Sequence, residues 1–210
     1  MPDTDLDTEN RILEAARSVF LRRGTTGARM REIADEAGVN QALLHYYFRT
    51  KEALAEAVFR KVARQLLPPI VAELRSDHRL EEKVKRVIEL ELDHLSRNPN
   101  LPAYLISELN HHPGRAPQLW EEVVGEPAGR TGSRVLEKLR EQLEEAADRG
   151  HVRPMEPEQF LVNLISLCIF PFAARPMLEA VLGLGEGEFE AFIEARRHSL
   201  PDFFLGALSP

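Results

Sequence analysis

Residues 29–51 read RMREIADEAGVNQALLHYYFRTK, and this stretch decides how the chain is organised. A short helix is predicted over residues 30–37, because several apolar residues share one side of it. These residues are Ile33, Ala34 and Ala37. Gly38 follows and can supply the positive φ that a tight turn uses, and Asn40 is a good N-cap for a second short helix. Two short helices joined by a glycine-containing turn form a helix-turn-helix.

The second short helix has two faces of different chemistry. Leu44 and Phe48 are four residues apart and are expected to point inward. The other face carries an amide, an imidazole, a phenol and one methyl group, from Gln41, Ala42, His45 and Tyr46. Such a face is suited to reading base edges in the major groove of DNA. The alternative is that Gln41 is only a solvated surface residue and that Tyr46 and Tyr47 belong to the domain core.

At these positions the chain resembles the DNA-binding domain of the TetR family of bacterial transcriptional regulators. The shared residues are Arg31-Glu32-Ile33-Ala34, Ala37-Gly38-Val39, Leu44, Tyr46-Tyr47-Phe48, Lys51-Glu52 and Leu54. Arg29 stands where the family often has a capping Ser or Thr, Ala42 where Gly is frequent, and His45 where Tyr is most frequent. The last two departures leave the base preference open, whereas Arg29 weakens a cap and adds a candidate phosphate contact.

The resemblance implies how this domain holds DNA. Arg31 is expected to reach a base or a phosphate, and Tyr47 and Lys51 to hold the DNA backbone. The candidate base contacts are Arg31, Gln41, Ala42, His45 and Tyr46, and the candidate phosphate contacts are Arg29, Tyr47 and Lys51. One small helix-turn-helix reads one half-site, so we expect a homodimer on a palindromic operator of double-stranded DNA, with recognition helices about 34–36 Å apart.

The distribution of charge fits this interpretation better than the total charge does. The net charge of −7 argues against a general nucleic-acid binder. Residues 8–51, however, hold 8 Lys and Arg against 5 Asp and Glu, while residues 52–210 hold 19 against 26. The positive charge therefore gathers where phosphates would lie. A surplus of this size would fit an ordinary solvated surface about as well.

The fold class is predicted to be all-α with about nine helices, because no segment alternates apolar and polar residues and no hairpin signal is present. An N-terminal three-helix DNA-binding domain is expected over residues 1–52, and a larger helical domain for effector binding and dimerisation over residues 53–210. The first helix is expected over residues 8–23. Further helices are expected over 51–67, 80–97, 101–110, 117–150 with breaks at its glycines, 158–182 with bends at Pro171 and Pro176, and 188–205.

The helix that begins at Lys51 links the two domains in the TetR family. Pro68 and Pro69 remove two N–H donors from it and are expected to stop or kink it. The proline pair is therefore a candidate hinge, and an ordinary corner between helices is an equal alternative.

The middle helices are expected to enclose a pocket for an unknown small-molecule effector, because polar and aromatic groups occur there within apolar segments. The candidates are Tyr104, Asn110, His111, Trp120, Phe170 and Arg175, each of which is more often structural when taken alone. By the resemblance, the last two helices supply the dimer interface. Its candidates are Phe160, Leu164, Ile165, Cys168, Phe189, Phe192 and Phe203, and the alternative is that half of them belong to the core of one subunit.

Other classes of function find little support in the sequence. There is no glycine-rich phosphate loop, no G-x-S-x-G and no H-E-x-x-H, so no enzyme, catalytic residue or cofactor is expected. A metal at His111 and His112 with Glu108 is rejected, because adjacent histidines on a helix cannot easily share one ion. A ligand-responsive regulator, by the resemblance a repressor, is the preferred interpretation. An all-α protein-interaction module without specific DNA binding is the alternative.

The expected compartment is the cytoplasm. Cys168 is the single cysteine, which excludes an internal disulfide and fits a reducing environment. The first residues are acidic and show no signal pattern. The most apolar window, residues 160–174, is shorter than the roughly 20 residues that a membrane helix needs.

Overall fold

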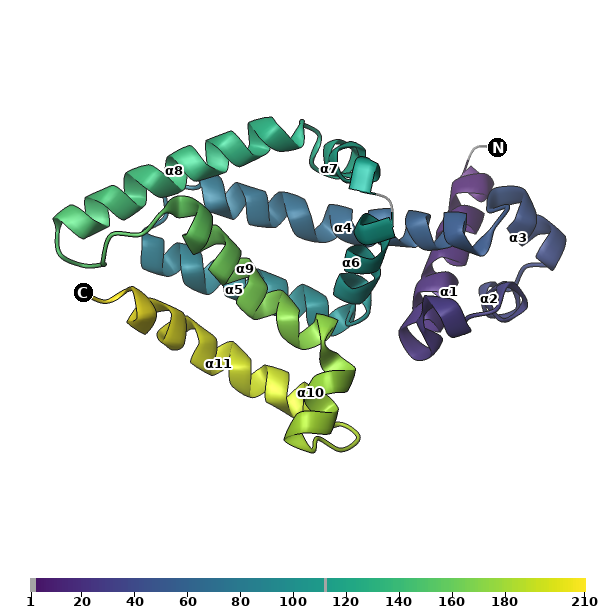
Figure 1. Cartoon of the computed structure of the whole chain (residues 1–210). Coiled ribbons are helices and arrows are strands. Elements are labelled where there is room, and N and C mark those ends of the chain that lie inside the picture. The colour runs from purple at the N-terminus through teal and green to yellow at the C-terminus, as the bar shows by residue number, and fades with distance from the viewer. Residues whose placement is uncertain (1–2, 112) are drawn as a thin grey trace. The chain divides into compact units, whose positions relative to one another are not determined.

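The computed structural model describes residues 3–111 and 113–210, and all regular secondary structure in that part of the chain is helical (Figure 1). It contains α1 (Asp3–Gly27), α2 (Met30–Ala37), α3 (Gln41–Tyr47), α4 (Lys51–Arg75), α5 (Leu80–Arg97), α6 (Leu101–His111), a 3₁₀ turn η1 (Pro113–Arg115), α7 (Ala116–Val124), α8 (Ala128–Asp148), α9 (Pro157–Ala173), α10 (Arg175–Leu182) and α11 (Glu188–Leu208). The all-α prediction is confirmed, and the predicted count of about nine helices was too low.

One additional helix comes from a break inside a segment that was expected to be a single bent helix. The predicted helix over 158–182 is two helices, α9 and α10, bent by 75°. The break lies at Ala174 (φ −107°, ψ 19°), and Pro171 remains inside α9. Pro176 lies in the first turn of α10, where its missing N–H would have had no helical partner. The glycines Gly129 and Gly132, expected to interrupt the chain, lie inside α8.

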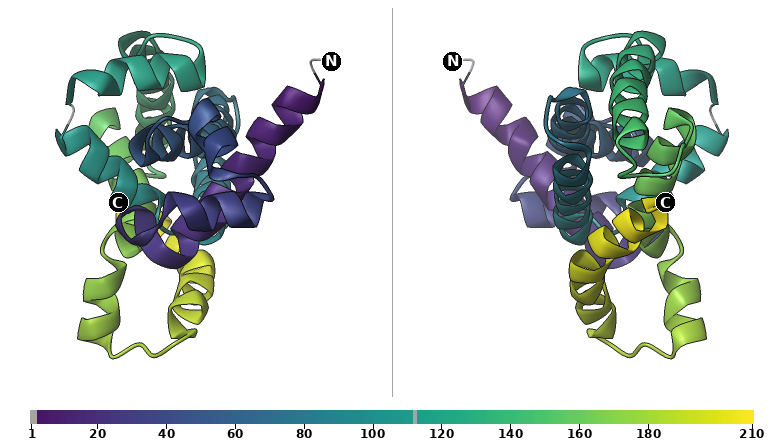
Figure 2. Two further views of the ribbon diagram at one scale, coloured as in Figure 1. Left: turned by 90° about the vertical axis from the view of Figure 1, so that its right-hand side faces the viewer. Right: turned by 90° about the vertical axis from the view of Figure 1, so that its left-hand side faces the viewer.

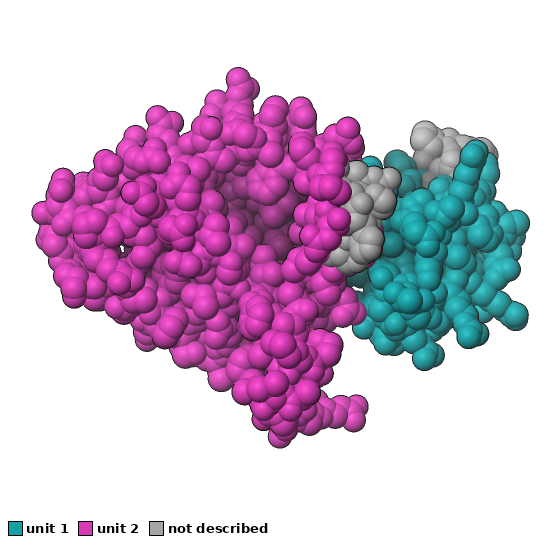
Figure 3. Space-filling view, viewed as in Figure 1, with its two compact units in different colours: residues 1–63 teal, residues 64–210 magenta. Residues whose placement is uncertain are grey.

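The chain divides into two compact units, residues 1–63 and residues 64–210 (Figure 3). The division falls inside α4. Unit 1 contains α1, α2, α3 and the first part of α4, and unit 2 contains the rest. Each unit has its own buried side chains. In unit 1 these include Ile12, Val19, Ile33, Leu44 and Leu54, each with none of its surface exposed.

Helix α4 continues through Pro68 and Pro69 to Arg75, so of the two outcomes expected for the pair, a stop or a kink, the stop does not occur. The two prolines leave the carbonyl oxygens of Arg64 and Gln65 without their usual i+4 amide donors. Both of these residues are exposed, so water can satisfy the two carbonyls and the helix persists. The helix is nevertheless short of two internal hydrogen bonds directly after the division between the units.

Unit 2 is built on α5, which packs against α9 and α11. The buried side of α5 follows helical spacing through Leu80, Val84, Val87, Ile88, Leu92 and Leu95. From the other helices, Leu139, Phe160, Leu164, Phe189 and Phe204 complete one continuous core. The rings of Phe160 and Phe204 meet edge to face at 5.3 Å between centroids. Figure 2 shows α10 and the beginning of α11 projecting from the rest of this unit.

Among the described helices, none is by itself long and apolar enough to cross a membrane. Only α9 and α10 together pass that test, and the 75° bend separates them.

Lys83 is a charged residue on the buried side of α5, with none of its surface exposed. Its ammonium group donates to the carbonyl oxygens of Leu74 (2.8 Å) and Ser76 (3.0 Å) and to Oε1 of Gln142 (2.6 Å). Burial, and then the charge of Lys138, lowers the pKa of Lys83 to about 8. Three donors meet three acceptors, so Lys83 ties the end of α4 to α5 and α8.

We expect Lys83→Met to lower the free energy of unfolding by about 1–3 kcal/mol, because the methionine fills the space but leaves three acceptors unsatisfied. Urea denaturation measures the effect. Lys85→Met, an exposed position on the same helix, is the matched control and should change stability by less than about 0.5 kcal/mol. Equal midpoints for the two variants would show that the buried ammonium group contributes nothing.

Candidate nucleic-acid interface

The turn between α2 and α3 is closed by two residues that the sequence singled out. Gly38 ends α2 in the left-handed region (φ 65°, ψ 35°), where a residue with a side chain would be strained. Asn40 caps α3, its Oδ1 accepting a hydrogen bond of 2.7 Å from the backbone N–H of Leu43. Leu44 and Phe48 point into the core of unit 1, with 0% and 7% of their surfaces exposed. The predicted helix-turn-helix is confirmed in its geometry.

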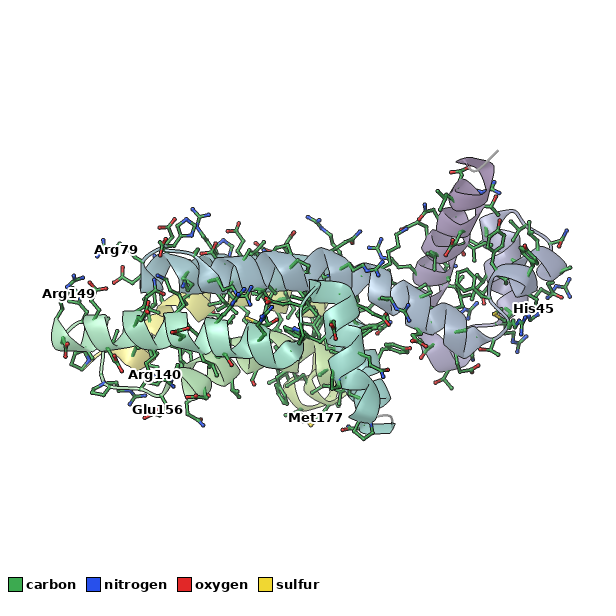
Figure 4. The ribbon with its side chains drawn as sticks, turned by 90° about the horizontal axis from the view of Figure 1, so that it is seen from above. His45, Arg79, Arg140, Arg149, Glu156 and Met177 are labelled. Atoms are coloured by element: carbon green, nitrogen blue, oxygen red, sulfur yellow. The ribbon has the colours of Figure 1, made fainter. Side chains whose placement is uncertain are left out.

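The outward face of α3 is polar and accessible, as predicted. Gln41, Ala42 and His45 are exposed, and Tyr46 is 77% exposed. Figure 4 shows His45 on the outside of unit 1. The ring of Tyr47 is half-buried and meets that of Tyr46 edge to face at 5.5 Å. Tyr46 therefore lies on the surface, whereas Tyr47 packs partly into the core of unit 1. Contact of these side chains with bases stays a prediction.

The four arginines at the ends of α1 and α2 nearest the helix-turn-helix fall into two groups. Arg22 pairs with Glu36, and Arg23 lies 3.5 Å from Glu32, so these cations join α1 to α2. Arg29 is exposed at the N-cap of α2, where its side chain makes no capping hydrogen bond. Within residues 3–111 and 113–210, Arg29 holds no ion pair. Arg31 is also exposed and lies 4.0 Å from Asp35, a loose pair. Arg29 and Arg31 are thus available to an anion.

We expect Arg29→Ala to weaken binding to operator and to unrelated DNA by the same factor. A phosphate contact carries no sequence information, and its loss should make the slope of log affinity against log salt shallower by about 0.9 per half-site. Fluorescence anisotropy at several salt concentrations measures both quantities. Arg79→Ala, which removes an exposed cation at the start of α5, should leave the slope unchanged. A loss confined to the operator would instead make Arg29 a base contact.

Lys51 has a structural role in addition to its predicted one. Its ammonium group donates to the carbonyl oxygens of Thr26 (3.1 Å) and Ala28 (3.3 Å). These oxygens belong to the end of α1 and to the connection into α2. Thr50 caps α4 just before it, accepting 3.0 Å from the N–H of Ala53. Lys51 therefore fixes the start of α4 against α1, and a phosphate would have to share it with two carbonyls.

The predicted effector residues are spread over α6, α7, α9 and α10 of unit 2. The Trp120 indole N–H donates to Oγ1 of Thr131 at 3.2 Å. The Arg175 guanidinium pairs with Glu179 (2.7 Å) and Glu190 (3.1 Å) and lies 4.2 Å from the Phe189 ring centroid. Both groups thus have structural partners. Their part in ligand binding stays a prediction.

The other four effector candidates differ in exposure. Tyr104 is half-buried, Asn110 is exposed and Phe170 is 52% exposed. The side chain of His111 lies outside the described residues, as does His112. A cavity of about 350 Å³ lies between the start of α5 and the ends of α8 and α11, and none of the six candidates lines it.

The predicted dimer residues divide between the core of unit 2 and its surface. Phe160, Leu164, Cys168 and Phe189 are at most 1% exposed and pack inside the unit. Ile165 and Phe192 are half-buried, and Phe203 is 65% exposed. The buried four are therefore core residues of one subunit, because helical spacing alone could not tell the inner face of α9 and α11 from an outer apolar one. Val162 and Met177, which the sequence did not single out, are 58% and 52% exposed. Figure 4 shows Met177 at the edge of unit 2.

The structure also shows buried ionisable residues that the sequence analysis did not select. Lys83 and Glu91 are 0% and 3% exposed. The signal was present in the sequence, because both fall on the buried side of α5, Lys83 next to Val84 and Glu91 between Val87 and Leu95. A charged residue on an apolar stripe is a departure from the amphipathic pattern.

A helix-turn-helix with an accessible polar face, followed by a separately packed helical unit, defines an all-α DNA-binding regulator. The sequence profile described as "Bacterial regulatory proteins, tetR family" matches residues 12–58, and "Tetracyclin repressor-like, C-terminal domain" matches residues 81–200. The chain belongs to the TetR family and is a DNA-binding transcriptional regulator. The alternative of an interaction module without DNA binding is set aside.

Relatives of this chain carry the same kind of description. The HTH-type transcriptional regulator RutR of Escherichia coli (strain K12) is 28% identical over 172 residues, which cover 82% of this chain and 77% of that protein. The HTH-type transcriptional regulatory protein RaaS of Mycobacterium tuberculosis (strain ATCC 25618 / H37Rv) is 30% identical over 154 residues, covering 73% and 64%.

Solved structures share the fold. A mutant of HlyIIR, a hemolysin II transcriptional regulator, superposes with a TM-score of 0.61 at 24% identity, covering 96% of this chain and 97% of that one. The regulator FadR of Bacillus subtilis, in complex with stearoyl-CoA, superposes with a TM-score of 0.59 at 16% identity, covering 94% and 98%.

Proposed function

We propose that the protein is a repressor that binds a palindromic operator as a homodimer and leaves it when a small molecule binds unit 2. The observation that carries the proposal is the polar face of α3, with Gln41, His45 and Tyr46 exposed and supported from below by buried Leu44. Such a face reads one half-site, and two copies read a palindrome. A protein of this fold, FadR of Bacillus subtilis, has been solved with stearoyl-CoA, which supports a ligand with a long apolar part.

The proposed dimer interface uses the outward sides of α9 and α11. Val162 of α9 and Phe203 of α11 are large apolar residues that are 58% and 65% exposed. Exposed apolar side chains on neighbouring helices are typical of surfaces that a partner covers. A second copy would bury them in a symmetric contact.

We expect Phe203→Glu to weaken dimerisation by at least about tenfold, because burying an unpaired carboxylate opposes association. Sedimentation equilibrium measures the dissociation constant. Phe203→Ala is a milder change and should weaken the dimer less. Glu144→Ala, at an exposed position on α8, is the control. An unchanged dimer of the glutamate variant would place the interface elsewhere.

Release from DNA is proposed to be a population shift between two dimer geometries. The ligand acts only through its different affinities for the two. Helix α4 connects the units and lacks the two internal hydrogen bonds that positions 68 and 69 would donate, which makes it a candidate for bending. If replacing both prolines by alanine left ligand-induced release intact, the hinge assignment would be lost.

The proposal is tested by selecting genomic DNA fragments with the purified protein and sequencing what is retained. Recovery of a palindrome supports a dimeric operator-binding regulator, and the neighbouring genes indicate the effector. Recovery of no enriched sequence from a folded dimer, both alone and with candidate ligands, would contradict operator binding. A half-site without its inverted partner would contradict the symmetric dimer.

A further inference from the structure

Glu91 is the most deeply buried carboxyl group of α5. It is 3% exposed and lies on the apolar stripe, one turn after Ile88 and one turn before Leu95. The thiol of Cys168, on α9, hydrogen-bonds to this carboxyl group. The second oxygen, Oε2, is buried and has no hydrogen-bond partner among the described residues. The core of unit 2 thus contains a carboxyl group that is only half satisfied.

No cation in the described part of the chain compensates Glu91. Cys168 is its hydrogen-bond partner, and Arg196 of α11 acts electrostatically on Cys168 rather than on Glu91. The Arg196 guanidinium is itself engaged, donating to the carbonyl oxygen of Leu167 at 3.2 Å from Nε and 2.9 Å from Nη2. Burial raises the pKa of Glu91 to about 8, so the group is mainly a neutral acid at pH 7.

Such a group is a poor structural choice for the core of a helical unit. An unpartnered buried oxygen destabilises the folded state, and leucine or methionine would fill the same space without that cost. Buried polar groups that lack hydrogen-bond partners are expected where a bound ligand supplies the missing partner. Figure 3 shows a recess in the surface of unit 2 on the face turned toward the viewer.

We propose that Glu91 is the polar anchor of the effector site, and that the effector is an apolar molecule carrying a protonated amine. This inference rests on the proposed function, because it names the ligand class of the same regulator. On binding, the O–H bond of Glu91 breaks and its proton passes to the solvent. The resulting carboxylate then pairs with the ammonium group, which donates to Oε2, while the S–H of Cys168 continues to donate to the carboxylate.

The chemistry of the site favours this class over the alternatives. An anionic ligand would lose its hydration on binding beside Glu91, and no cation there would compensate for that loss. A neutral alcohol would gain one ordinary hydrogen bond. An ammonium group supplies both a donor for the open oxygen and the missing positive charge, and charge-assisted hydrogen bonds are the stronger kind.

The test compares three ligands that share one apolar chain, dodecylamine, dodecanol and dodecanoate, by titration calorimetry below their aggregation concentrations at pH 7. The variants are Glu91→Gln and, as matched control, Glu89→Gln, which changes an exposed carboxylate two residues away. Dodecylamine should bind the unchanged protein and Glu89→Gln at least about tenfold more tightly than Glu91→Gln. Dodecanol should bind all three proteins equally, and dodecanoate should bind the most weakly.

Proton release separates a direct role of Glu91 from a merely structural one. Titrations in two buffers of different protonation enthalpy should show about one proton released per amine bound by the unchanged protein and by Glu89→Gln. Glu91→Gln should release none. Absence of dodecylamine binding, equal binding to Glu91→Gln, or binding without proton release would each overturn the inference. These readouts need no DNA, so failure to recover an operator would count against the proposed function alone.

Discussion

Glu91→Gln should make the protein more stable at neutral pH, and the gain should disappear in acid. Burial raises the pKa of Glu91 from 4.5 to about 8. Between these values the unfolded chain releases a proton that the folded chain keeps, so stability falls by about 1.4 kcal/mol for each pH unit. The penalty is absent below about pH 4 and amounts to about 3 kcal/mol at pH 7. Glutamine does not titrate and avoids it.

The measurement is the difference in unfolding free energy between variant and unchanged protein, from urea denaturation at pH 4.5, 6 and 8. Other groups titrate over this range, and subtracting the two proteins removes their contribution. Glu89→Gln, at an exposed position, should give a difference near zero at every pH. A Glu91→Gln difference that stayed constant with pH would show that Glu91 is ionised in the folded protein. A stabilising change that removes effector binding would be a trade of stability for function.

Replacing Gln41 and His45 together by alanine should lower operator affinity by about 10²–10⁴-fold at fixed salt, because each good base contact contributes about 1–3 kcal/mol of discrimination. Both side chains are exposed. His45 makes a loose contact, with Nδ1 at 3.4 Å from the carbonyl oxygen of Arg49. Alanine favours helix, so α3 should keep its fold. Affinity for unrelated DNA should fall by less than about threefold, since phosphate contacts supply it.

Electrophoretic mobility shift with the selected operator and with a scrambled duplex measures both affinities. The matched control removes an exposed glutamine and an exposed histidine from unit 2, by Gln118→Ala and His151→Ala, and should leave both affinities unchanged. An equal loss on the two duplexes would reassign Gln41 and His45 to the DNA backbone. If the double variant kept its affinity for both duplexes, α3 would not be the helix that reads the operator.

Local rules predicted the first unit well. A left-handed glycine and an asparagine cap fix the turn at Gly38 and Asn40, and their effects extend over only a few residues. The inward pair Leu44 and Phe48 follows from helical spacing. The polar face of α3 could therefore be predicted from residue types and spacing, whereas its contacts with DNA need a complex to be seen.

The larger unit depends on packing between distant residues, which a single sequence does not show. Phe160 and Phe189 were expected in a dimer interface and lie in the core, because an apolar face does not say whether its partner is the same chain. Helix α4 continues through Pro68 and Pro69. The two carbonyl oxygens that lose their amide donors belong to Arg64 and Gln65, which are at exposed positions. The sequence places Glu91 on the apolar stripe of α5, but only the structure shows that it is buried beside Cys168.

The division of α4 between residues 63 and 64 also bears on how such proteins diversify. Each unit closes its own core, so a genetic crossover at that point would exchange one unit without opening the other. Under the proposed function, the first 63 residues would carry the operator preference into the hybrid, and the remainder would carry the response to the effector. A shared helix whose backbone already tolerates two prolines is a permissive place for such a joint. Under the proposed function, such an exchange would give the regulator a new effector with the same target genes, or new target genes with the same effector.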